Sequence, residues 1–209
     1  MIPNGTRFIG IADSVNLTER KSSLINNETQ PYTIDDIRGY KVFTALLTQS
    51  GGENIQYYDE GTITIGVTYL ITANAPGELG EGDFTNVGAP NNLVGTRFMA
   101  TGTTPNSWGT FSELEYNEGA PIATVLENTI GNIWFGYTDV GYYDILSIDN
   151  LFIEDKTFVL FGTYVDPEAR IIYASILNNT NIINIGNTSN TGLIDGALLN
   201  TPIEIRVYN

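Results

Sequence analysis

A glycine-rich stretch from Gly80 to Trp108 decides the fold, and it reads G-E-G-D-F-T-N-V-G-A-P-N-N-L-V-G-T-R-F-M-A-T-G-T-T-P-N-S-W. Its glycines permit positive φ, and the A-P-N-N run at residues 89–92 has the composition of a turn. Residues 97–101 predict a short strand, which the turn-forming residues 102–105 end. The stretch therefore predicts a loop, a strand and a turn, and it offers no obvious catalytic group.

Three aromatic side chains are the candidate core of this stretch. They are Phe84, Phe98 and Trp108. Aromatic side chains bury a large apolar area, so a few of them can hold a glycine-rich segment together. We expect these three residues to form a small core.

The same stretch resembles a known module. The pattern G-D-F-T-N-V-G-A at residues 82–89, followed by G-T-x-F-x-A-T-G-T-T-P at residues 95–105 and then by Trp108, is similar to a module that recurs in structural proteins of tailed bacteriophages. The pattern has several fixed positions within a short span. The resemblance implies a component of the virion and leaves open which component.

Length and composition favour an all-β protein. A chain of 209 residues suits one or two compact domains and should bury about 70% of its unfolded surface. Its 22 glycines, together with many asparagines and threonines, are typical of turns and short strands. Cysteine and histidine are both absent from the sequence, which excludes disulfides, the usual zinc sites, and Ser-His-Asp or Cys-His catalytic centres.

The charge is strongly acidic and unevenly distributed. The net charge is −15, from 9 basic and 24 acidic side chains. The first 41 residues contain equal numbers of both, so the whole imbalance lies after residue 41. An acidic surface repels phosphate groups, which argues against a nucleic-acid partner. The neutral N-terminal part is the section whose surroundings need not be bulk water, unless its neutrality is a chance fluctuation over a short window.

No segment has the features of a secretion signal or a membrane span. No apolar run follows a basic start at the N-terminus, and none approaches the ~20 apolar residues needed to cross a bilayer. We expect a soluble protein that is made in the cytosol and has no membrane partner.

Residues 1–40 differ from the rest of the chain in their pattern of apolar and polar residues. Residues 7–11 (R-F-I-G-I) predict a strand that is apolar on both faces, and residues 33–36 (T-I-D-D) predict a short helical turn. The polar segment between them shows no regular period. Because this part has too little apolar surface for its own core, we expect an extended arm that docks on the rest of the chain or on another protein.

After residue 40 the sequence predicts many short strands, each bounded by Gly, Asn, Asp or Pro, which is typical of all-β proteins. In residues 62–72 the alternation is clear, and one face would carry Ile63, Ile65, Val67, Tyr69 and Ile71. The predicted strands are residues 41–48, 62–72, 97–101, 111–116, 123–127, 132–138, 141–147, 156–163, 170–177, 182–185 and 203–208.

A second resemblance connects distant parts of the chain. Residues 42–51 (V-F-T-A-L-L-T-Q-S-G) and 120–131 (A-P-I-A-T-V-L-E-N-T-I-G) look like two pieces of one β domain found in phages of Bacteroidetes-type hosts. Residues 157–159 and 199–208 fit the same domain. N-terminal segments of such virion proteins are similar to residues 8–11 and 31–37.

This resemblance implies a domain organisation. A parent β domain, a β-sandwich or jelly-roll-like fold, would consist of residues 41–52 and 119–209. Residues 53–118 would be an inserted glycine-rich β module, whose two ends must lie close together. Residues 1–40 would form the N-terminal anchoring arm.

Carboxylates are the only plentiful acid–base groups, and none of them is singled out by its sequence context. A glycosidase needs two carboxyl groups roughly 5–10 Å apart across a cleft. Pairs such as Asp139 with Asp144, or Asp166 with Glu168, could satisfy this only through tertiary structure. A solvated acidic surface is the interpretation we favour, so we predict no catalytic residue.

An acidic loop offers a second alternative. Glu78, Glu81 and Asp83 could present oxygen ligands to Ca²⁺, but their spacing does not match a known calcium loop. We favour the interpretation that these residues form the acidic tip of a loop, and we predict neither a metal nor a cofactor.

Neighbouring aromatic residues suggest carbohydrate binding, because aromatic rings stack on sugars. In a strand, however, one member of each adjacent pair points into the core. The other member could contact a glycan or lie at a subunit interface, where Tyr and Trp are enriched. The candidate glycan contacts are Trp108, Trp134 and Tyr142.

Together these observations favour a non-enzymatic structural protein of a phage virion, assembled in the host cytoplasm as an outer capsid decoration or head-fibre component. The arm would bind the major capsid protein or another virion protein, and the resemblance implies a homotrimer. The predicted assembly interface is Phe8, Ile9, Ile11, Tyr32, Ile34 and Ile37. The alternative is a tail-fibre or receptor-binding protein that recognises host surface glycans.

Overall fold

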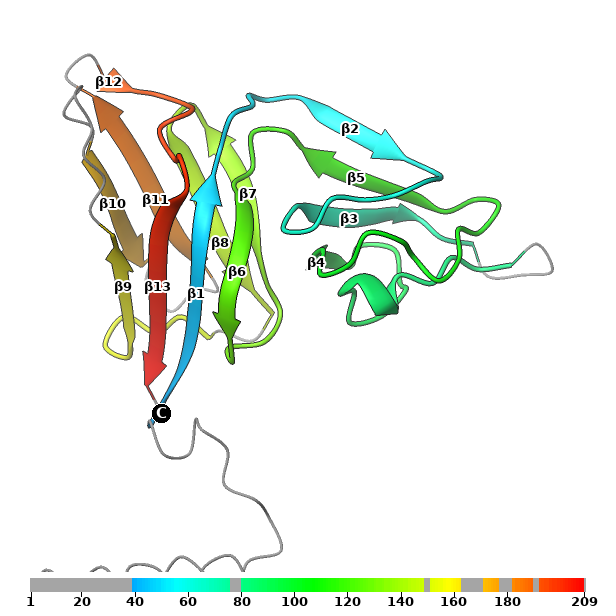
Figure 1. The fold of residues 1–209 in the computed structure, drawn as a ribbon, viewed down its shortest axis with the longest axis horizontal. Coiled ribbons are helices and arrows are strands. Elements are labelled where there is room, and N and C mark those ends of the chain that lie inside the picture. The colour runs from blue at the N-terminus through cyan, green and yellow to red at the C-terminus, as the bar shows by residue number, and fades with distance from the viewer. Residues whose placement is uncertain are drawn as a thin grey trace, which may run out of the picture. The chain divides into compact units, whose positions relative to one another are not determined.

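The computed structural model describes residues 39–75, 80–148, 151–162, 171–176, 182–189 and 192–208 (Figure 1). These residues form antiparallel strands and one short 3-10 turn, η1 (Thr85–Val87), without any α-helix. The prediction of an all-β protein is confirmed. The strand and the helical turn predicted in the N-terminal arm lie outside the described residues. Within the described part of the chain, no helix is long and apolar enough to span a membrane.

Two of the three sheets form a sandwich. The first sheet has the strand order β6-β1-β13-β9, and the second has the order β10-β11-β8-β7 with β12 paired to β11. The first sheet contains β1 (Tyr40–Thr48), β6 (Ile122–Asn128), β9 (Thr157–Phe161) and β13 (Thr201–Tyr208). The second sheet contains β7 (Ile133–Asp139), β8 (Tyr142–Ser147), β10 (Ile171–Ile176), β11 (Ile182–Ser189) and β12 (Gly192–Leu193).

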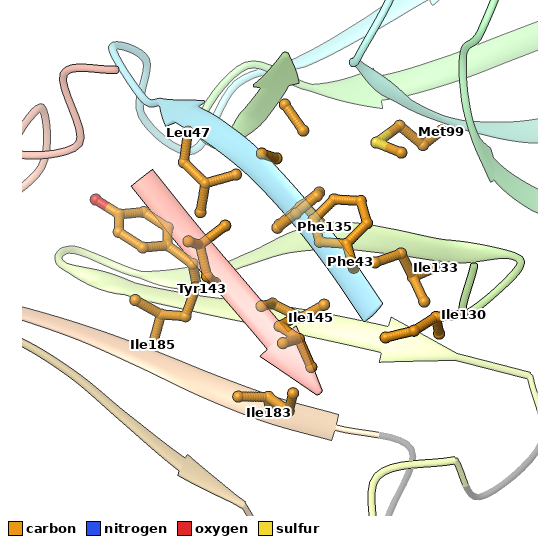
Figure 2. Close-up of a cluster of buried hydrophobic side chains, with 14 of the residues drawn as sticks. Phe43, Leu47, Met99, Ile130, Ile133, Phe135, Tyr143, Ile145, Ile183 and Ile185 are labelled. Carbon is orange, nitrogen blue, oxygen red and sulfur yellow. The ribbon is translucent and has the colours of Figure 1, made fainter. Parts of the chain in front are cut away.

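The main core lies between these two sheets. Along β13, Ile203, Ile205 and Val207 are buried and alternate with more exposed residues, as a strand with one covered face requires. Phe43 from the first sheet and Phe135 from the second sheet have ring centroids 6.1 Å apart. Figure 2 shows side chains from both sheets pointing into the same space. The two inner faces therefore pack as a β-sandwich.

The third sheet lies within residues 55–117 and has the strand order β2-β5-β3-β4. Phe84 and Phe98 are fully buried in its core, and Trp108 packs edge to face on Phe84 with ring centroids 5.3 Å apart. The small aromatic core predicted for the glycine-rich stretch is confirmed. The strands of this sheet are β2 (Ile55–Tyr58), β3 (Thr68–Ala73), β4 (Arg97–Met99) and β5 (Glu113–Asn117).

The two connections between the third sheet and the sandwich lie side by side. The Glu118 N–H donates to the Asn54 carbonyl at 2.9 Å, and the Asn54 side chain donates to the Glu118 carboxylate at 3.2 Å. A Cβ at Gly51 would lie 2.3 Å from the Glu118 carbonyl oxygen, so this close approach requires glycine. The chain therefore enters and leaves the third sheet through one narrow base.

The prediction of a single strand over residues 62–72 is wrong in its first half. Strand β3 begins only at Thr68, and Ile65 is 53% exposed instead of sharing the buried face. The chain turns at Gly66, which has a φ of 83°. The Gly66 carbonyl accepts a hydrogen bond from the Ala123 N–H of β6 at 3.1 Å. A contact between distant segments therefore overrides the local alternation.

Two strands have no signal in the sequence pattern. Strand β2 has mostly exposed side chains and therefore no hydrophobic alternation. Strand β12 has only two residues. Pairing with β5 and with β11, respectively, makes these segments extended.

Strand β7 is joined to the third sheet by hydrogen bonds on either side of Trp134. The Phe135 N–H donates to Thr68 Oγ1 at 2.9 Å, and the Asn132 side chain donates to the Arg97 carbonyl at 3.3 Å. Met99 of β4 is buried and belongs to the sandwich core (Figure 2). These contacts hold β4 and β7 together.

Candidate functional site: two exposed sheet faces

The outer face of the first sheet, which is turned away from the core, carries exposed apolar side chains. Leu126 is 66% exposed, Phe158 is 49% exposed and Leu160 is 40% exposed. Leu126 lies at a bulge, where β6 has one residue more than β1. Pro202 of β13 is also exposed on this face. We call these four residues the apolar patch.

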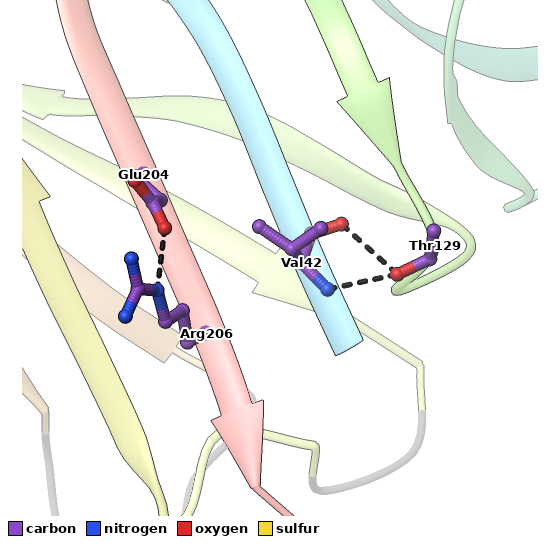
Figure 3. A network of polar contacts seen from close by, with 4 residues as sticks. All are labelled: Val42, Thr129, Glu204 and Arg206. Carbon is purple, nitrogen blue, oxygen red and sulfur yellow. Dashed lines mark hydrogen bonds and ion pairs between the residues drawn. The ribbon is translucent and has the colours of Figure 1, made fainter. Parts of the chain in front are cut away.

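The apolar patch lines a shallow groove. Leu126, Leu160 and Pro202 contribute to this groove, which has a volume of about 340 Å³. Beside it, the Val42 N–H donates to Thr129 Oγ1 at 2.8 Å and fixes the end of β6 against β1 (Figure 3). Clustered apolar side chains on a solvent-facing surface are typical of an interaction site.

The charged residues of β13 on this face are paired with each other. Arg206 Nε donates to Glu204 Oε1 (Figure 3), and this hydrogen bond raises the pKa of the Arg206 guanidinium above its ordinary value. The guanidinium also lies 5.2 Å from the centre of the Tyr40 ring. Tyr40 in turn contacts Tyr208, with ring centroids 5.2 Å apart. Because the two charges offset each other, β13 adds little net charge beside the apolar patch.

The predicted assembly interface cannot be located in this structure. Its residues, Phe8, Ile9, Ile11, Tyr32, Ile34 and Ile37, all lie outside the described residues. The described chain begins at Gly39, directly before β1.

The three predicted glycan contacts do not form one site. Trp108 Nε1 donates to the Gly61 carbonyl at 2.9 Å, and its ring packs on the core of the third sheet. Trp134 pairs with Leu146 across the outer face of the second sheet, whereas Tyr142 lies four residues further along β8, roughly 14 Å away by strand geometry. Tyr142 instead accepts a hydrogen bond from the Tyr173 hydroxyl at 3.4 Å.

Trp134 lies in a second groove, which has a volume of about 350 Å³. One wall belongs to the second sheet and the other to the loop that leads into β4. We call this site the Trp134 groove; its lining residues are Pro90, Asn91, Gly95, Thr96, Arg97, Trp134 and Ile148. Sequence reasoning missed Asn91 and Arg97, because they are about forty residues from Trp134 along the chain. No local motif links the two segments.

Asp83 is the centre of a hydrogen-bond network in the third sheet's loops. Its Oδ1 accepts from the Thr85 N–H at 3.0 Å, from Thr85 Oγ1 at 2.6 Å and from Asn92 Nδ2 at 3.3 Å. Its Oδ2 accepts from Asn106 Nδ2 at 2.8 Å. These hydrogen bonds, above all those from Thr85, hold the pKa of Asp83 well below its ordinary value.

The three acids weighed as calcium ligands are therefore not equivalent. Glu78 lies outside the described residues, and Glu81 is exposed. Both oxygens of Asp83 already accept hydrogen bonds from protein groups. Among the described residues, no group of three or more acidic side chains could hold a metal ion.

The acid pairs weighed as catalytic groups show only local contacts where they are described. Asp139 accepts from the Val140 N–H at 2.7 Å, and Asp144 accepts from Thr138 Oγ1 at 2.8 Å. Asp166 and Glu168 lie outside the described residues. Neither Asp139 nor Asp144 lines the two grooves described above.

A polar network at one end of the sandwich was not predicted from the sequence. Gln49 is buried at the end of β1, and its Oε1 accepts from the Gly196 N–H and from the Tyr143 hydroxyl. Asp195 accepts from the Tyr137 hydroxyl at 3.0 Å. Burial and this hydrogen bond raise the pKa of Tyr137 to about 12. The network connects three separate segments and has the character of a structural tie.

Comparison with protein-family models, with curated proteins and with solved structures finds no match for this chain.

Proposed function

We propose that this protein is a non-enzymatic structural component of a tailed-phage virion, an outer capsid decoration or head-fibre subunit that acts by assembly. The arm of residues 1–40 anchors it to the major capsid protein or another virion protein. The two sequence resemblances and the neutral charge of the arm support this proposal. The protein self-associates, and the expected assembly is a homotrimer.

The observation that carries the proposal is the apolar patch on the first sheet. Full burial of a Leu or Phe side chain contributes about 1.5–3 kcal/mol of stabilisation. Leu126, Phe158 and Leu160 are partly exposed in an isolated chain, so covering them would add several kcal/mol of favourable free energy. A second copy packed on this face would recover that free energy. Such a surface suits a protein that covers or joins others.

Particle labelling tests the virion assignment. Antibody raised against residues 39–209 should label the outside of intact phage particles in electron micrographs, and label on the head is the expected result. Absence of the protein from purified particles would contradict the proposal. Label confined to the tail would favour the second candidate below.

A substitution in the apolar patch tests self-association. Leu160→Glu should convert the assembled protein to monomer at micromolar concentration, because a carboxylate placed in an apolar contact loses its hydration without gaining a partner. Size-exclusion chromatography with light scattering measures the mass. The control is Leu93→Glu, since Leu93 is 67% exposed, lies in the loop that leads into β4 and does not belong to the patch. A wild-type protein that is monomeric under these conditions would refute the assembly mechanism.

The second candidate is a tail-fibre or receptor-binding protein that recognises host surface glycans. The observation that favours it is the Trp134 groove, where an aromatic side chain is flanked by polar and charged residues. The two candidates predict label at different positions on the particle.

A further inference from the structure

We propose that the Trp134 groove binds a saccharide that carries a carboxylate group, and that Arg97 selects for that group. This inference rests on the second candidate function, glycan recognition. It does not depend on the apolar patch, which lies on the first sheet.

Trp134 offers an apolar platform to the groove. The residues before and after it in β7, Ile133 and Phe135, are buried in the sandwich core. The indole of Trp134 therefore lies on the opposite, outer face of the strand. The indole Nε1, its only polar atom, is buried without a hydrogen-bond partner. The accessible surface of the side chain is therefore entirely carbon. A carbon surface of this kind stacks on the C–H face of a sugar ring.

The groove is held in shape by the protein itself. The hydrogen bonds made by Asn132 and Phe135 fasten β7 to the third sheet on both sides of Trp134. Gly136, the next residue of β7 on the outer face, has no side chain to cover the platform. A site built before the ligand arrives loses less conformational entropy on binding.

Arg97 supplies the positive charge. Met99, two residues further along β4, packs into the sandwich core, so Arg97 shares that side of the strand and lies at the wall of the Trp134 groove. Arg97 is exposed and has no ion-pair partner among the described residues. An unpaired guanidinium matches a carboxylate through two parallel hydrogen bonds.

Asn91 adds a neutral donor at the same wall. Its Oδ1 already accepts from the Leu93 N–H at 2.9 Å and from Thr96 Oγ1, and these bonds orient the amide. Its Nδ2 has no partner within the part of the chain that the structure describes. This N–H group is available to a sugar hydroxyl.

Size and charge favour an acidic saccharide over a protein partner. The groove volume of about 350 Å³ is at the lower end of the range for small-molecule sites. The net charge of −15 opposes an anion at long range, but salt at physiological strength screens charges beyond about 8 Å. At contact, the nearby guanidinium dominates.

A glycan array with paired probes tests the proposal on the full chain. Oligosaccharides that bear uronic or sialic acids are printed beside the same compounds with the carboxyl group esterified. Wild-type protein should bind acidic members at least tenfold more tightly than their esters. Arg97→Gln should abolish that preference, and Trp134→Ala should weaken binding to both forms.

Lys156→Gln is the matched control, because Lys156 is exposed elsewhere and its loss changes the net charge by the same amount. It should leave the preference intact, and circular dichroism should be the same for all variants. Absence of binding across the array, equal binding of acids and esters, or Arg97→Gln behaving like Lys156→Gln would each overturn the proposal. Particle labelling is read separately, so failure here leaves the virion assignment standing.

Discussion

At the scale of single residues, Asp83 explains how a glycine-rich loop keeps one conformation. Loops without a large core depend on side chains that satisfy backbone donors. The Asp83 carboxylate connects three segments through Thr85, Asn92 and Asn106. Hydrogen bonds to a charged acceptor are stronger than those between neutral groups.

Asp83→Ala should lower the free energy of unfolding by about 1–3 kcal/mol, because it leaves several donors without their acceptor. Urea unfolding at pH 7 measures this change. Asp59→Ala is the control, since Asp59 is an exposed acid and its loss should cost less than about 0.5 kcal/mol. Equal effects of both substitutions would show that the Asp83 network does not stabilise the fold.

The same residue predicts a pH dependence. The pKa of Asp83 is lower in the folded protein than its value of about 4 in an unfolded chain. The carboxylate therefore contributes stability that is fully present above pH 4 and is lost as the pH falls through the folded-state pKa. Unfolding measured from pH 5 downward should show a smaller loss of stability for Asp83→Ala than for wild type. Parallel curves would contradict the assigned pKa direction.

At the scale of elements, the turn at Gly66 joins the third sheet to β6 of the sandwich. Gly66 combines a positive φ with a backbone contact, since a Cβ there would lie 2.1 Å from the Ala123 carbonyl oxygen. Gly61 has nearly the same φ, 85°, and no atom within 4 Å of such a Cβ. An alanine at Gly61 would therefore add backbone strain alone, whereas an alanine at Gly66 would add the same strain and a steric clash.

Gly61→Ala should cost about 1–2 kcal/mol, which is the strain of a left-handed alanine. Gly66→Ala should cost about 1–3 kcal/mol more, because the added methyl group also forces β6 away from the turn. Chemical denaturation of the two variants measures the difference. Equal losses would mean that the Gly66 contact with β6 is not tight in solution.

At the scale of the whole molecule, the central strand β1 controls the sandwich. It pairs with β6 on one side and with β13 on the other, and Tyr40 lies opposite Tyr208 at the end of the ladder. Residues 39–209 form a compact unit that contains all three sheets.

Removal of residues 1–38 should therefore leave a folded protein with the circular dichroism of β-sheet and cooperative thermal unfolding. Removal of residues 1–44 should abolish folding, because it deletes half of β1 together with the buried Phe43. The shorter deletion should also prevent incorporation into particles. An unfolded 39–209 fragment would contradict the fold assignment. A 39–209 fragment that is incorporated normally into particles would contradict the anchoring role of the arm.

Local patterns in the sequence were sufficient for the fold class and much of the core. The alternation in β13 predicts its buried face, and the aromatic residues of the glycine-rich stretch predict the core around Phe84 and Phe98. Both signals are local, because residues close together in the sequence are sufficient to indicate a buried strand face or a small aromatic core.

The tertiary structure alone decided the turn at Gly66 and the Trp134 groove. The residues before β3 alternate like a strand, yet contact with Ala123 turns the chain there. Asn91 and Arg97 meet Trp134 only because β4 packs beside β7. The hydrophobic periodicity of a segment indicates which of its side chains are buried. Which other segment it packs against depends on residues far away in the sequence, so no single stretch of sequence contains that information.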